Sequence, residues 1–251
     1  MTDKAMTDKP VPIIRPYRPS DRAAVRRICC DTAYRNKGAE YLFEDREIHA
    51  DYWSSYYTDV TPNNVSVVEL DGQVIGYFFG CTDTRAFRRH MARRIVPSCL
   101  ARALWRLATG RYKSPVSRRY LWFMLTKAAG EEAPMDMDRF PAHYHCNLTE
   151  ASRGLQLYTQ LTLDFLDQLE ADGITGIHGF ITEPAKRGIW DMFEKRYIEL
   201  IKDENVLRTE KPTKSLEYIV GDTTPMVNRG WGCDIPVYRA YMQFLRDKMR
   251  I

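Results

Sequence analysis

The spacing of apolar and polar positions predicts a strand followed by two helices at the start of the chain. Residues 11–17 form the first predicted strand. Ser20 and Asp21 provide a helix cap and a first-turn acid for a helix that continues to about Tyr34. Residues 45–57, which are rich in aromatic side chains, form the second predicted helix.

Two alternating apolar runs then predict a β-hairpin. The runs cover residues 65–70 and 73–80, and Asp71-Gly72 joins them. Asp-Gly favours the positive φ angles that a tight turn requires. We therefore expect the second and third strands to be antiparallel.

A helical pattern occupies the next part of the chain. Apolar residues recur three or four positions apart, at Val96, Leu100, Leu104 and Leu107. Pro97 and Pro115 are expected to divide this stretch into shorter helices. We expect residues 85–140 to be a mainly helical insertion between the third and fourth strands.

The second half of the chain predicts a strand, a helix and a further strand in close succession. Residues 142–149 alternate as a strand does, and the helix that follows stops at Gly173. Residues 174–181 form the next strand, so that this βαβ unit implies parallel neighbours. The last predicted elements are a helix at 185–196, a strand at 198–207 and a strand or helix at 236–244.

Length and composition indicate a cytoplasmic α/β protein. The 251 residues are 44% hydrophobic, and no run of 18 uncharged apolar residues occurs. Residues 1–10 are polar and lack the apolar region of a secretory signal. We expect a flexible N-terminus at 1–10 and one domain at 11–251. The six cysteines show no paired spacing, which indicates reduced thiols rather than disulfides or a metal site.

Positive charge is concentrated in the insertion. Between positions 85 and 119 there are eleven basic residues and no acid, whereas the whole chain has a net charge of +4. The basic residues are Arg85, Arg88, Arg89, Arg93, Arg94, Arg102, Arg106, Arg111, Lys113, Arg118 and Arg119. Three interpretations remain open: a solvated helix face, a site for an acidic ligand, or a surface for a polyanion or anionic lipid.

The junction of a strand and a helix at residues 149–154 carries the clearest functional signal. The first amides of a helix lack internal partners, so such a junction binds anions. Residues 141–154, followed by the leucine-rich helix, resemble motif A of the GNAT acyltransferases. Phe193-Glu194-Lys195 is similar to the Tyr-Glu-Lys of motif B, and the hairpin resembles the second and third strands of that family.

The resemblance implies a GNAT-like mixed central sheet that is splayed between its fourth and fifth strands, flanked by helices. It also implies acetyl-CoA as acyl donor. The pantetheine arm would contact Cys146, Asn147 and Leu148. The pyrophosphate would meet amides at Arg153, Gly154, Leu155, Gln156, Leu157, Tyr158 and Thr159. The chain departs from the family pattern in having Gln156 and Tyr158 where small residues are usual.

The resemblance also suggests how protons would move. His145 is the predicted general base, because an imidazole titrates near neutrality, and Asn147 would orient substrate or water. Phe193 stands where the family usually has the tyrosine that acts as general acid. Tyr197, one helical turn later, is therefore the predicted general acid. Both His145 and Tyr197 are also compatible with purely structural roles. A site of three histidines, His143, His145 and His178, is less favoured than hydrogen-bonded strand histidines.

The sequence thus predicts an N-acetyltransferase that transfers an acetyl group from acetyl-CoA to a primary amine of a small molecule. An anionic acceptor would suit the basic insertion. The alternative is a GNAT-like binding module that has lost acyl-CoA. We expect no metal and no nucleic-acid partner, since no nucleic-acid motif is recognisable. A homodimer is compatible with the sequence.

Overall fold

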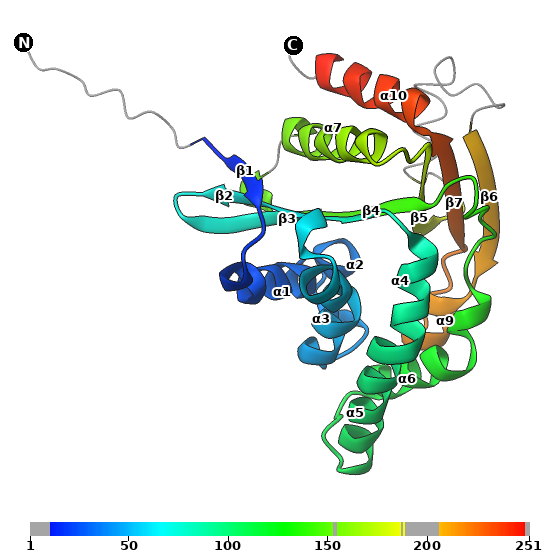
Figure 1. Ribbon diagram of the computed structural model, residues 1–251. Helices are drawn as coiled ribbons and strands as arrows, with labels where there is room; N and C mark the ends of the chain where they lie inside the picture. The colour runs from blue at the N-terminus through cyan, green and yellow to red at the C-terminus, as the bar shows by residue number, and fades with distance from the viewer. Residues whose placement is uncertain (1–10, 153–154, 187, 189–205, 249–251) are drawn as a thin grey trace, which may run out of the picture.

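The computed structural model describes residues 11–152, 155–186, 188 and 206–248 (Figure 1). Predictions for residues 1–10, and for most of the helix and strand expected between 185 and 207, fall outside these residues. No helix in the described ranges is both long enough and apolar enough to cross a membrane.

In the part of the chain that the structure describes, seven strands form one mixed sheet in the order β1-β2-β3-β4-β5-β7-β6. The strands are β1 (Ile13–Pro16), β2 (Val65–Leu70), β3 (Gln73–Cys81), β4 (Ala142–Leu148), β5 (Gly176–Pro184), β6 (Val206–Thr213) and β7 (Met226–Asp234). Every neighbouring pair is antiparallel except β4 and β5, which are parallel. The predicted mixed central sheet is therefore confirmed.

The turn between β2 and β3 has the predicted geometry. Asp71 has φ of 50° and Gly72 has φ of 75°, and the strands on either side are antiparallel. Two consecutive positive φ angles match the right-handed twist of a hairpin. The local Asp-Gly signal was therefore sufficient to predict this turn.

The sheet opens between β4 and β5. These strands pair only at Ala142 with Ile177 and at His143 with His178. Beyond that point β4 continues along β3 as far as Leu148, whereas β5 pairs with β7. Among the described residues, 144–148 consequently have no strand partner on the β5 side, and the predicted splay is confirmed.

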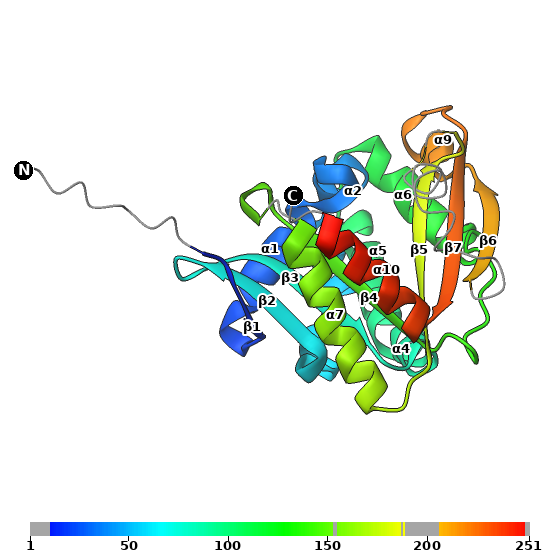
Figure 2. The same ribbon diagram turned by 90° about the horizontal axis from the view of Figure 1, so that it is seen from above.

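Helices cover both faces of the sheet (Figures 1 and 2). On one face lie α7 (Leu155–Ala171) and α10 (Ile235–Lys248), so the segment 236–244 is helical. On the other face lie α1 (Arg22–Asp31) and α3 (Arg46–Ser55), which a π-helical turn at Tyr56–Val60 extends. The apolar stripe predicted for α7 is buried against the sheet and α10, with Leu169 fully enclosed.

The first predicted helix ends earlier than expected. It stops at Asp31, and Tyr34, Arg35 and Asn36 have φ of 51°, 60° and 64°. This left-handed stretch lies within α2 (Ala33–Asn36). Because left-handed geometry is unfavourable for residues with a Cβ, side-chain pattern alone does not predict it. Short 3₁₀ turns occur at Pro19–Asp21, Ala39–Tyr41, Pro62–Asn64, Ala128–Gly130 and Glu150–Ser152.

The insertion is helical, as predicted, and lies between β3 and β4. Its elements are α4 (Thr84–His90), a π-helical turn (Met91–Ile95), α5 (Val96–Ala108) and α6 (Pro115–Thr126). Pro97 does not divide this stretch, because it lies in the first turn of α5, where its missing N–H is not needed. Pro115 begins α6. The end of the insertion that carries α6 packs against α9 (Ser215–Val220).

Candidate active site

A cavity of about 430 Å³ lies where β4 and β5 separate. Its walls include His143 and His145 from β4 and Phe180 from β5. Trp53 of α3 and Glu131, which follows α6 in the chain, complete the wall on the side of the insertion. The cavity thus adjoins the stretch of β4 that has no strand partner on the β5 side.

His145 is positioned by its aromatic neighbours and by Asn147. Its ring stacks on Trp53, with centroids 6.0 Å apart, and Nε2 lies 3.3 Å from Asn147 Nδ2. Asn147 Nδ2 also donates to the Tyr77 hydroxyl at 2.7 Å. Burial lowers the pKa of His145 to about 4, so the ring is neutral at pH 7. This differs from the near-neutral titration that the sequence suggested. The neutral ring has one lone pair, on Nε2, where the Asn147 amide donates to it.

His143 has both ring nitrogens occupied. Thr84 Oγ1 donates to the Pro141 carbonyl at 2.7 Å and lies 2.6 Å from His143 Nδ1, so it accepts from Nδ1–H. Nε2 then accepts from the Tyr57 hydroxyl at 2.9 Å. Burial lowers the pKa of His143 to about 3. The hydrogen bonds assign a structural role to this histidine.

His178 lies beside His143 and is hydrogen-bonded to the backbone. The two rings are 5.6 Å apart, and His178 Nδ1 donates to the Phe140 carbonyl at 2.7 Å. Among the described residues, no group of three histidine, cysteine or acidic side chains is arranged to hold a metal ion.

Glu131 brings a carboxylate to the cavity that our sequence analysis did not single out. Its backbone carbonyl accepts from Asn228 Nδ2 at 2.7 Å, which anchors this loop to β7. Its side-chain Oε2 is buried and has no hydrogen-bond partner among the described residues. A buried carboxylate oxygen without a donor indicates a missing partner. No local motif marks this glutamate, because its role depends on β7 lying beside the loop.

Three tyrosine hydroxyls meet on the opposite face of β4. Tyr144 contacts the hydroxyls of Tyr158 in α7 and Tyr238 in α10, the latter at 2.6 Å. Burial raises the pKa of Tyr144 well above its ordinary value, so the hydroxyl keeps its proton. The Tyr158 side chain therefore points toward the sheet, and Gln156 is exposed.

The residues predicted to bind the donor divide into two groups. Cys146, Asn147 and Leu148 all lie in the stretch of β4 without a β5 partner. Leu155, Gln156, Leu157, Tyr158 and Thr159 form the start of α7, in which Thr159 Oγ1 donates to the Gln156 carbonyl at 3.0 Å. Arg153, Gly154 and Tyr197 lie outside the described residues.

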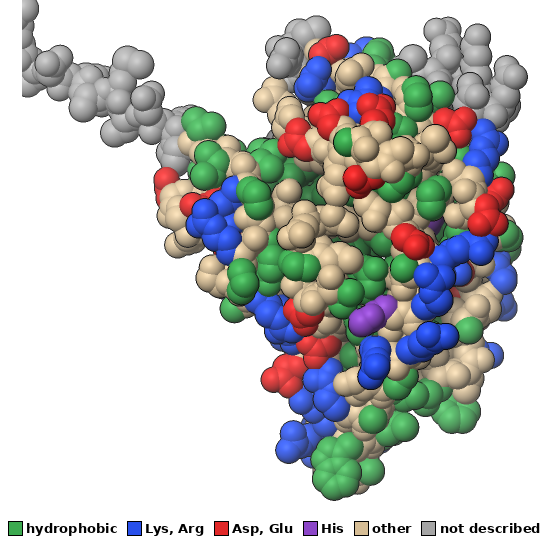
Figure 3. All heavy atoms as spheres, in the orientation of Figure 1, with side chains coloured by type: hydrophobic (Ala, Val, Ile, Leu, Met, Phe, Trp, Pro, Cys, Tyr) green, Lys and Arg blue, Asp and Glu red, His purple; other side chains and the backbone are tan. Residues whose placement is uncertain are grey.

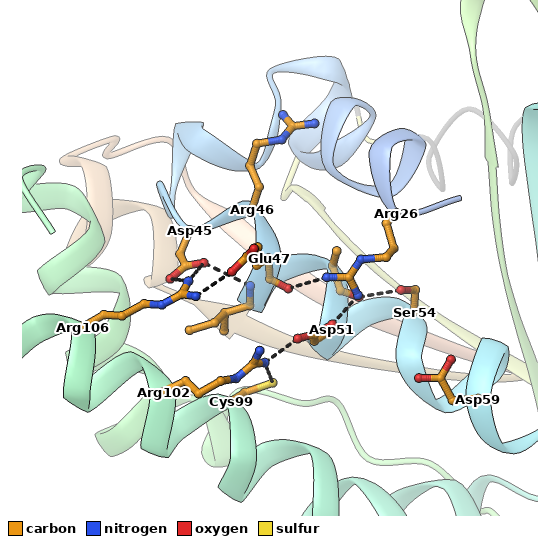
Figure 4. Close-up of polar contacts among 12 residues, drawn as sticks. Arg26, Asp45, Arg46, Glu47, Asp51, Ser54, Asp59, Cys99, Arg102 and Arg106 are labelled. Carbon is orange, nitrogen blue, oxygen red and sulfur yellow. Dashed lines mark hydrogen bonds and ion pairs between the residues drawn. The ribbon is translucent and has the colours of Figure 1, made fainter. Parts of the chain in front are cut away.

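Acids at the N-cap of α3 and within that helix neutralise part of the positive charge of the insertion (Figure 4). Arg106 Nη1 donates to both carboxylate oxygens of Asp45 at 2.6 Å, and Arg106 Nη2 donates to Glu47. Arg102 pairs with Asp51, which also pairs with Arg26 of α1. These ion pairs attach α5 to α3.

Other basic residues of the insertion are also engaged. Arg85 pairs with Asp138, and Arg88 pairs with Glu132. Lys113, Arg118 and Arg119 donate to backbone carbonyls. Within the described residues, no salt bridge is present at Arg89, Arg93, Arg94 and Arg111. Figure 3 shows blue basic side chains interspersed with red acidic ones, rather than one continuous positive field.

No family model matches the chain, and no curated protein matches it. Among solved structures, the chain is similar to SsHAT, with a TM-score of 0.56 and 22% identity over 90% of this chain and 99% of that one. An N-acetyltransferase from Staphylococcus aureus Mu50 matches with a TM-score of 0.46 and 11% identity, covering 90% and 99% of the two chains. The yncA protein of Salmonella typhimurium, solved with its cofactor acetyl-CoA, matches with a TM-score of 0.41 and 14% identity, covering 88% and 92%. The similarity to SsHAT and the splayed sheet together show that the chain has the fold of the GNAT acetyltransferases.

Proposed function

We propose that the protein transfers an acetyl group from acetyl-CoA to a primary amine of a small molecule. The observation that carries this proposal is the free edge of β4 beside a cavity that contains His145 and Glu131. The edge would bind the acetyl-CoA donor, and the cavity would bind the amine acceptor.

The donor side fits an extended amide-containing chain. Residues 144–148 present peptide groups toward the gap, where β5 does not pair with them. Such an edge can hydrogen-bond the amides of a pantetheine arm, as another strand would. The start of α7 offers helix amides to a pyrophosphate, and the Tyr158 side chain is turned toward Tyr144. The bulky residue at position 158 therefore does not argue against the donor.

The acceptor side fits a cationic amine. Glu131 offers an unpartnered carboxylate oxygen, and Trp53 and Phe180 offer aromatic faces. Carboxylates and aromatic rings both attract an ammonium group. In the proposed reaction, the amine attacks the thioester carbon, and its nitrogen then becomes acidic enough to lose a proton to neutral His145. Asn147 Nδ2 gives up its hydrogen bond to His145 Nε2, and that nitrogen takes the proton. Tyr197, outside the described residues, remains the proposed acid that returns a proton to the leaving thiolate.

Calorimetry with acetyl-CoA tests the donor side first. We expect measurable heat and a rise in melting temperature, since a ligand at 100 times its Kd stabilises a native protein by about 2.7 kcal/mol. ATP is the matched control ligand, because it carries adenosine and phosphates but no pantetheine. Equal binding of ATP and acetyl-CoA would contradict a role for the β4 edge. No binding of acetyl-CoA at millimolar concentration would favour the alternative binding module.

A thiol-release assay with a panel of primary amines tests transfer itself. We expect release of free CoA that depends on the amine and on enzyme concentration. The panel includes amines with and without a carboxylate, because an anionic group on the acceptor is still only a prediction.

A single domain, a cytoplasmic location, a homodimer and the lack of a nucleic-acid partner also stay predictions.

A further inference from the structure

A second, smaller cavity lies between α3, α5 and α6. Its volume is about 110 Å³, and its walls are almost entirely apolar. Ala103 of α5 and Leu121 of α6 are buried in these walls. An enclosed apolar cavity of about 150 Å³ holds a benzene ring. This cavity is smaller but open at its rim, so it has room for a single ring or a short alkyl chain that projects partly from it.

His49 is the polar exception in the wall. Its side chain lies on α3 and the residue is only 5% exposed, yet Nδ1 has no hydrogen-bond partner among the described residues. Burial lowers the pKa of His49 to about 4, so the ring is neutral. An unpaired buried nitrogen is unfavourable, and a ligand that supplies a hydrogen-bonding atom would remove this cost.

Trp53 separates this cavity from the candidate active site. The indole lines both cavities, as does Tyr52. On one side the indole stacks with the His145 ring, with ring centroids 6.0 Å apart. On the other side its centroid lies 6.3 Å from that of the His49 ring. A molecule whose amine lies near His145 therefore has to extend past Trp53 and Tyr52 to enter the second cavity.

The rim of the second cavity is accessible. Trp53, Val96 and Leu125 line it and are 41%, 37% and 45% exposed. Large apolar side chains with this exposure are unfavourable in water when they cluster, and they mark binding surfaces. The rim residues belong to α3, α5 and α6, so the insertion contributes most of the site.

We propose that this cavity binds the apolar end of the acceptor, and that His49 Nδ1 hydrogen-bonds a polar atom carried by that end. The inference rests on the proposed function and narrows its substrate class to primary amines with an aromatic ring or a short alkyl chain. The acyl chain of the donor is the other apolar group that could enter this cavity. The kinetic experiment below distinguishes the donor's acyl chain from the acceptor's apolar end.

A binding experiment tests the cavity without any catalysis. Toluene and phenol are titrated separately in thermal-shift measurements. Toluene at about ten times its Kd should raise the melting temperature by about 3 °C. Ala103→Leu, which fills the cavity, should abolish this rise, and Ala101→Leu, on the exposed side of α5, should not. No rise in the wild type, or equal rises in both variants, would overturn the proposal.

The His49 variant tests the hydrogen bond. The wild type should bind phenol about three- to tenfold more tightly than His49→Phe does, whereas toluene affinity should change little. His49→Phe keeps an aromatic ring in place, so it also serves as the second variant should Ala103→Leu fail to fold. An unchanged phenol affinity in His49→Phe would contradict the role of Nδ1.

Kinetics then identify the source of the apolar group. With acetyl-CoA, kcat/KM should rise about fourfold per methylene from ethylamine to pentylamine, and Ala103→Leu should remove this gain. A gain with hexanoyl-CoA over acetyl-CoA that Ala103→Leu removes, with no effect of amine length, would overturn the acceptor assignment. Binding of both probes without transfer to any amine would support the cavity and contradict the proposed function.

Discussion

The His145 imidazole stacks on the Trp53 indole, with ring centroids 6.0 Å apart and planes inclined by 22°. This contact joins β4 to α3 and sets the orientation of the predicted base. The same indole separates two cavities of different character. The chemistry proposed here therefore depends on a contact between residues that are far apart in the sequence.

His145 should be the most sensitive position for catalysis. We expect His145→Gln to lower kcat about 10² to 10⁴-fold, the usual contribution of a general base, with little effect on acetyl-CoA affinity. Steady-state kinetics and calorimetry measure the two effects. His143→Gln is a poor control, because both ring nitrogens of His143 are hydrogen-bonded within the fold. An unchanged kcat in His145→Gln would remove His145 from the mechanism.

Tyr197→Phe should lower turnover by a similar factor if this hydroxyl protonates the leaving thiolate. The loss should be smaller with a donor whose thiol is more acidic, because protonation then matters less. Comparing acetyl-CoA with such a thioester measures that difference. A loss that is the same for both donors would indicate a structural role for Tyr197.

Glu131→Gln should raise KM for the amine about tenfold or more and leave kcat nearly unchanged, because a charge-assisted hydrogen bond contributes about 1.5 to 3 kcal/mol. Asp138→Asn is the control, since it removes the same charge from an exposed residue outside the cavity, whose carboxylate pairs with Arg85 at 2.7 Å. Initial-rate measurements over a range of amine concentrations give both constants. Equal effects of the two variants would show that only overall charge matters.

Asp45→Asn should lower the free energy of unfolding by about 1.5 to 3 kcal/mol, because it weakens charged hydrogen bonds from Arg106 and a bond from the Tyr112 hydroxyl at 2.8 Å. This loss of stability should be smaller than that from breaking a fully buried ion pair, because Arg106 still donates to the Glu47 carboxylate. Asp59→Asn is the control: its partner Arg22 is 41% exposed, and such pairs contribute about 0 to 1 kcal/mol. Urea denaturation of both variants measures the difference.

The stability of the protein should fall between pH 7 and pH 5. Burial lowers the pKa of His143 to about 3 and those of His49 and His145 to about 4, from 6.5. The unfolded chain therefore takes up protons below about pH 6.5 that the folded protein takes up only near pH 4 or below. Each histidine contributes up to about 1.4 kcal/mol per pH unit in that window.

Urea denaturation at pH 7.5, 6 and 5 checks this expectation. His49→Phe should reduce the change in the free energy of unfolding per pH unit, because one of the three histidines no longer contributes to it. His90→Gln, which removes a histidine from α4 in the insertion, is the control variant. A stability that is constant from pH 7.5 to 5 would show that these histidines are not held neutral by the fold.

Much of the fold could be predicted because the signals are local. Asp71-Gly72 specifies the turn through its own φ angles, and the apolar stripe of α7 is visible within one helix. The βαβ unit predicts the parallel pairing of β4 and β5, because a helix between two strands returns the chain to the end of the sheet where the first strand began. The prediction that residues 146–148 contact the pantetheine arm of acetyl-CoA depends on the same βαβ unit.

The sequence by itself determined most of the strands and helices up to residue 181, since side-chain periodicity and turn chemistry act over a few residues. It did not predict α9 or β7, and it left 236–244 as either a strand or a helix. Only the tertiary structure decided which polar groups find partners. Tyr57 and Thr84 enclose His143, and Asp45 meets Arg106 across 61 positions of sequence. Glu131 Oε2 and His49 Nδ1, in contrast, remain without partners among the described residues. Such outcomes depend on strand register and helix docking, because hydrogen bonds form over about 3 Å between groups that no local pattern brings together.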